Sequence, residues 1–114
     1  MEIGQVIQQG EVRIKRIADL PEDHGGTQRK TTDKGHILAH SESGHHHILD
    51  GGTVLDRPTK NGLESLYALL EQPQKVVQDA ATPHESINLP AGVYDIRISR
   101  EYNPMLGEAR RVAD

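Results

Sequence analysis

The sequence predicts a small, mostly β, single-domain protein, built as a β barrel or a β sandwich. Its 114 residues suffice for one hydrophobic core, so residues 1–114 are taken as one domain. Many short apolar segments follow one another, separated by glycine and proline, which is typical of an all-β chain. The three aromatic residues are all tyrosine, so the core must consist mainly of leucine, isoleucine and valine.

The first third of the chain contains one predicted strand and one predicted loop. Within residues 11–17, Val12 and Ile14 alternate with charged residues, the pattern of a strand that is buried on one face. Residues 22–34 are polar and include Gly25-Gly26, so we expect a long, flexible loop there.

The middle of the chain predicts a series of short strands. Two strands within residues 36–49 flank a polar turn, and a third at 53–55 follows the turn signal Asp50-Gly51-Gly52. A further strand is predicted at 75–78 from its β-branched residues. Residues 63–70 fit two structures, because their leucines match helical spacing while Ser65, Tyr67 and Leu69 would line one face of a strand.

The clearest strand lies near the end of the sequence. Within 93–102, Tyr94, Ile96 and Ile98 share one face, and polar residues occupy the other. Residues 108–112 are expected to form a short C-terminal helix. The residues predicted to lie inside the fold are Val12, Ile14, Leu38, Ile48, Val54, Val76, Ile96 and Ile98.

Charge and composition exclude several classes of function. Thirteen basic and seventeen acidic residues are interspersed and give a net charge of −4, so nucleic-acid binding is not expected. The chain has no cysteine, which excludes disulfides, thiolate nucleophiles and cysteine-bound zinc. No apolar segment approaches the roughly 20 residues that cross a bilayer, and no leader is recognisable, so a cytoplasmic location without membrane contact is expected.

A cluster of histidines is the most distinctive chemical feature. Five of the seven histidines fall within residues 36–47. On a strand, His45 and His47 would point to the same side and could chelate a divalent metal such as Zn, Ni, Mn or Fe. His84, just before the last predicted strand, is the expected third ligand. The alternative third ligands are His36, His40, Asp50 and Glu85.

The same residues carry a resemblance to known proteins. Gly44-His45-His46-His47, the segment from His84 to Tyr94 (HESINLPAGVY) and Arg100-Glu101-Tyr102 resemble a group of small uncharacterised bacterial and phage-associated proteins. More distantly, His45, His47 and the turn Pro90-Ala91-Gly92 resemble the two motifs of cupins, which implies a metal-binding barrel. Asp95 stands where the second cupin motif has its histidine, so His84 would have to supply the third ligand.

Three functions follow as hypotheses. The first is a metal-binding β protein that acts on a small molecule, with no catalytic residue assigned. The second is a non-catalytic module, of phage origin, that contacts another protein through strand edges or through the face bearing Arg97, Arg100 and Glu101. The third is a metal-free small-molecule binder. Open strand edges and a thin core also favour a homo-oligomer.

Overall fold

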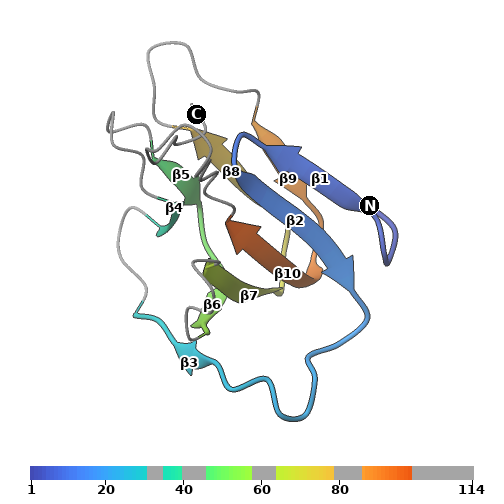
Figure 1. Ribbon diagram of the computed structural model, residues 1–114. Coiled ribbons are helices and arrows are strands. Elements are labelled where there is room, and N and C mark those ends of the chain that lie inside the picture. The colour runs from blue at the N-terminus through green and yellow to red at the C-terminus, as the bar shows by residue number, and fades with distance from the viewer. Residues whose placement is uncertain (31–34, 40–45, 58–63, 79–85, 99–114) are drawn as a thin grey trace, which may run out of the picture.

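The computed structural model describes residues 1–30, 35–39, 46–57, 64–78 and 86–98. These residues form two open antiparallel sheets rather than one closed barrel (Figure 1). The larger sheet has six strands in the order β1 (Val6–Gln9), β2 (Val12–Ile17), β10 (Gly92–Ile98), β7 (Glu64–Leu70), β6 (Thr53–Asp56) and β3 (Thr27–Gln28). The smaller sheet has four strands in the order β4 (His36–Ala39), β5 (His47–Leu49), β8 (Gln74–Gln78) and β9 (Ile87–Leu89). The predicted β class is thus confirmed.

Strand β10 lies inside the larger sheet, between β2 and β7. Ile96 lies opposite Ile14 on β2 and Leu66 on β7, so the alternating apolar residues of three strands form one continuous face. Tyr94, Ile96 and Ile98 are fully buried on that face, as their period-two spacing predicts. The Tyr94 hydroxyl donates a hydrogen bond to the Pro90 carbonyl oxygen at 2.6 Å.

The smaller sheet contributes the other half of the core. Leu38, Leu49, Val76 and Leu89 pack in the same apolar cluster as Val12, Ile14 and Val54 of the larger sheet. The two predicted strands within 36–49 pair antiparallel as β4 and β5. Their register shifts between Ile37 and Ala39, and both Leu38 and Ala39 are buried there.

The structure decides two predictions, one about the secondary structure of residues 63–70 and one about the burial of Ile48. Residues 64–70 form strand β7, with Leu66, Ala68 and Leu70 in the core cluster, so the helical alternative is wrong. Ile48 was expected inside, but it is only half-buried because it alternates with His47 and Leu49, which take the inner positions of β5.

Three of the described strands were not predicted from the sequence. These are β1, β9 and β3, of which β3 interrupts the loop predicted at 22–34. Strand β1 forms a tight hairpin with β2 through Gly10 and Glu11, and the φ angle of Gly10 is +56°, the positive value that such turns require. The helix expected at 108–112 lies outside the described residues.

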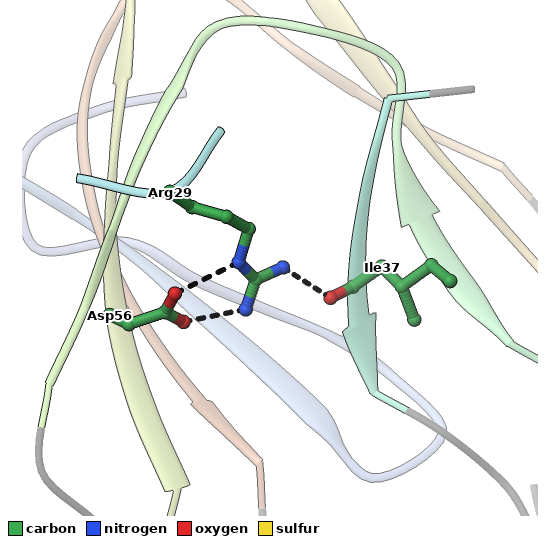
Figure 2. A network of polar contacts seen from close by, with 3 residues as sticks. All are labelled: Arg29, Ile37 and Asp56. Atoms are coloured by element: carbon green, nitrogen blue, oxygen red, sulfur yellow. Dashed lines mark hydrogen bonds and ion pairs between the residues drawn. The ribbon is translucent and has the colours of Figure 1, made fainter. Parts of the chain in front are cut away.

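Arg29 ties the two sheets together at one side. Its guanidinium pairs with both carboxylate oxygens of Asp56 on β6, at 3.0 and 2.6 Å, and donates to the Ile37 carbonyl oxygen on β4 at 2.6 Å (Figure 2). Figure 2 shows the side chain lying between Asp56 and the β4 backbone. One planar group thereby bridges a strand of each sheet.

The connection between β5 and β6 brings the chain from one sheet to the other through Gly52. Its φ angle is +95°, and an added Cβ would lie 2.4 Å from a terminal carbon of Leu70. A residue without a side chain is therefore required at this crossing. The Gly52 carbonyl oxygen also accepts a hydrogen bond from Nε2 of buried His36 at 2.9 Å.

Candidate functional site

His47 occupies the first position of β5 and is fully buried. Its register neighbours are Ala39 on β4 and Gln78 on β8. The side chain faces the larger sheet, where its Nδ1 lies 2.8 Å from Oε1 of Gln9, the last residue of β1. The imidazole is therefore placed between the sheets rather than on the surface.

The hydrogen bonds of Gln9 fix the form of this imidazole. Gln9 donates from Nε2 to the Val76 carbonyl oxygen at 3.2 Å, and because a carbonyl can only accept, this contact sets which end of the amide faces His47. Oε1 also only accepts, so Nδ1 of His47 must carry the proton. In the neutral ring Nε2 then holds the lone pair, the same tautomer that a histidine adopts when it binds a metal through Nε2.

The other described histidines have different surroundings. His36 lies opposite Leu49, at the other end of the β4 and β5 ladder from His47. Because its Nε2 donates to Gly52, its Nδ1 holds the lone pair, and this buried atom has no hydrogen-bond partner within the described ranges. His24 accepts a hydrogen bond from the Gly26 amide at 2.9 Å and packs edge-on against Tyr67, with ring centroids 6.2 Å apart. His46 is half-buried.

The expected metal site can be compared with the structure only in part. Of the three predicted ligands, His47 is described, while His45 and His84 lie outside the described residues, as do the alternatives His40 and Glu85. Within the described ranges, no three histidine or carboxylate side chains come together as a metal site. Asp50, another alternative, is exposed.

The sequence reasoning missed Gln9, which holds His47 in place. A signal was available, since Val6-Ile7 and Val12-Arg13-Ile14 flank Gly10 as two strands flank a tight turn. That pattern would have placed Gln9 at the end of an edge strand. It would not have shown that the strand faces His47, because this contact joins residues 38 positions apart.

Comparison with known proteins places the chain in a family. A family described as Domain of unknown function (DUF8820) matches residues 8–99. The chain belongs to the DUF8820 family. The matched range of this DUF8820 domain includes Gln9, the histidine cluster and the segment from His84 to Tyr94, and it ends just before Arg100. The family description names no activity and makes no link to cupins or phages.

No curated protein and no solved structure matches the chain significantly. None of the residues that the structure describes belongs to a helix long and apolar enough to cross a membrane.

Proposed function

We propose that this DUF8820 domain binds one divalent metal ion through His47, His45 and His84. The observation that carries the proposal is the contact between His47 and Gln9, which holds the imidazole with its proton on Nδ1 and its lone pair on Nε2. Metal-binding histidines commonly donate their other ring N–H to an oxygen in this way, since that bond fixes the ring orientation and raises the basicity of the ligand nitrogen.

The topology of the smaller sheet supports the choice of the other two ligands. Gln78 ends β8 and lies opposite His47, which begins β5. Strand β9 is antiparallel to β8, so it begins at this same end of the sheet. Strands β5 and β9 therefore begin at the same end of the smaller sheet, on either side of β8.

The segments that carry His45 and His84 are long enough for both histidines to reach one ion with His47. His45 precedes His47 by two residues, and His84 precedes Ser86 by two residues. Two residues of extended chain span about 7 Å, and strands β5 and β9, which flank β8, are about 10 Å apart. Imidazoles from both segments thus have the reach to meet the same ion, with bonds of about 2.0 to 2.1 Å if it is zinc.

Three histidine ligands would leave a coordination position open. A water molecule or a small-molecule substrate would occupy it, as in metal sites that carry out reactions. The domain would then act on a small molecule bound at the metal ion. Zn, Ni, Mn and Fe are the candidate ions.

The metal content of protein purified without an affinity tag or a nickel column tests the proposal. We expect about one equivalent of metal per chain by elemental analysis. His45→Ala and His84→Ala should each remove most of it, and His24→Ala serves as the matched control because His24 packs against Tyr67 instead. Metal-free protein that takes up no added metal would refute the proposal, and so would equal losses in all three variants.

A further inference from the structure

The outward face of β2 and β10 carries a cluster of charged residues. Arg13 and Lys15 on β2 are exposed, and Arg97 and Asp95 on β10 share their face of the sheet. Their inward neighbours, Ile14 and Ile96, are fully buried, so the backbone that carries the cluster is held by the core.

The register places like charges against each other. Arg97 lies directly opposite Arg13, while Asp95 lies opposite Lys15. Two like charges in a cross-strand pair destabilise a sheet, and here two arginines lie opposite each other between β2 and β10. The cluster has three cations and one carboxylate, although the whole chain has a net charge of −4. Such a local conflict is typical of a binding site.

The four side chains also line a hollow with a volume of about 160 Å³. Asp95 interacts with Arg97 through two long contacts of 3.4 and 3.5 Å, and the Arg97 side chain remains 55% exposed. Contacts of this length are weak, so the Arg97 guanidinium can still donate hydrogen bonds to an anion in the hollow. Asp95 also lies opposite Lys15 in the register, so this one carboxylate faces two of the three cations of the cluster.

We propose that this hollow is an anion site for a dianionic phosphate group. The cluster has an excess of two positive charges, which one dianion neutralises. Two guanidinium forks and one ammonium group also suit the several oxygens of a terminal phosphate better than they suit a single carboxylate, which one arginine already satisfies. The phosphate belongs to a free small molecule or to a phosphorylated protein segment, because both present the same group.

Titration with inorganic phosphate at constant ionic strength tests the site. Backbone amide signals of β2 and β10 should shift saturably in NMR spectra of the full chain, and sulfate should compete. Arg13→Gln and Arg97→Gln should each weaken phosphate binding at least about tenfold, since each removes a charge-assisted hydrogen-bond partner. Lys75→Gln is the matched control, because it removes one exposed cation from the smaller sheet and should change the affinity less than about twofold.

Further titrations identify the source of the phosphate, and three results would contradict the proposed site. A phosphoserine peptide that binds at least about tenfold more tightly than inorganic phosphate would identify a phosphorylated protein as the source, and equal affinities would identify a small molecule. Three results would overturn the site: no saturable shift, equal weakening in Lys75→Gln, or binding of single-stranded DNA that lacks a terminal phosphate but not of inorganic phosphate. Circular dichroism of each variant confirms folding before titration, and two independent arginine variants guard against the failure of one.

Discussion

His47 on β5 and Gln9 on β1 are joined by a hydrogen bond of 2.8 Å between Nδ1 and Oε1. The two residues belong to different sheets, and both are almost completely inaccessible to solvent. Gln9 also contacts the Val76 carbonyl oxygen, so one amide side chain links β1 to two strands of the smaller sheet. The bond therefore contributes to the stability of the fold as well as to the proposed metal site.

Replacing Gln9 separates these two contributions. Gln9→Ala should lower the free energy of unfolding by about 1–3 kcal/mol, because the buried imidazole N–H and the Val76 carbonyl lose their amide partner. It should also weaken metal binding about 10- to 100-fold, the usual effect of losing such a supporting residue. Urea denaturation of the apo protein and metal titration measure the two effects.

Gln8→Ala is the control for that variant, because Gln8 is exposed on the same strand and its side chain donates to the nearby Gly10 carbonyl oxygen. It should leave metal affinity unchanged. If Gln9→Ala bound metal as tightly as the unmodified chain, the proposed role of Gln9 would be wrong.

Metal binding should depend steeply on pH. Imidazole coordinates a metal only through an unprotonated nitrogen, and an ordinary histidine has a pKa of about 6.5. With three histidine ligands, affinity should fall up to about tenfold per histidine for each pH unit below about pH 6. Thermal melts with added zinc, nickel or manganese should show a large increase in Tm at about pH 7.5 and a small one at about pH 5. An increase that is the same at both pH values would argue against histidine ligands.

Loss of the Arg29 bridge should destabilise the fold moderately. Arg29→Ala should lower the free energy of unfolding by about 1–2 kcal/mol, because it removes a bidentate ion pair and a hydrogen bond to Ile37. The loss should be no larger because the paired side chains are 27% and 44% exposed, and exposed ion pairs contribute little to stability.

Arg29→Lys tests the geometry of the bridge. A lysine keeps the charge but cannot contact both oxygens of Asp56 and the Ile37 carbonyl with one planar group, so it should restore less than half of the lost stability. Full restoration in urea denaturation would show that charge alone matters at this position.

Tyr94 should make the protein sensitive to alkaline pH. Burial raises the pKa of its hydroxyl above the ordinary value of 10.0, and the nearby Arg16 lowers it by a smaller amount. Above about pH 10 the unfolded chain therefore loses this proton before the folded chain does, so the stability from Tyr94 is complete below that pH and declines as the pH rises. Tyr94→Phe should remove this part of the alkaline decline.

The same variant should cost about 0.5–1.5 kcal/mol at neutral pH, because the hydrogen bond to Pro90 is lost. Urea denaturation at about pH 7 and about pH 10.5 gives both values. An identical alkaline decline in the variant would show that other groups cause it.

Alternation of apolar residues predicted the central strands correctly, because those strands have one buried and one exposed face. Val12, Ile14, Ile96 and Ile98 are all fully buried as expected. The very short strands gave no such signal. Ile48 shows the difficulty, since in the three residues of β5 the inner positions belong to a histidine and a leucine, and hydrophobicity alone cannot reveal that order.

The candidate site was only partly accessible to the same reasoning. The strand that contains His47 was predicted from the short apolar segments within residues 36–49, but Gln9 has no motif of its own and acts through a contact between sheets. The charged hollow was missed for a related reason. Arg13 and Arg97 are ordinary exposed residues in the sequence, and only the antiparallel register brings them opposite each other.

The strands of the larger sheet are not synthesised in the order in which they lie side by side. Strand β10 lies between β2 and β7, yet it is the last described strand in the sequence, and Val12 pairs with Ile98. On the ribosome, the edge of β2 that pairs with β10 must therefore stay unpaired until residues 92–98 have emerged. Pairing across such a long separation is slow, so the nascent domain should remain dependent on chaperones until synthesis of β10 is complete.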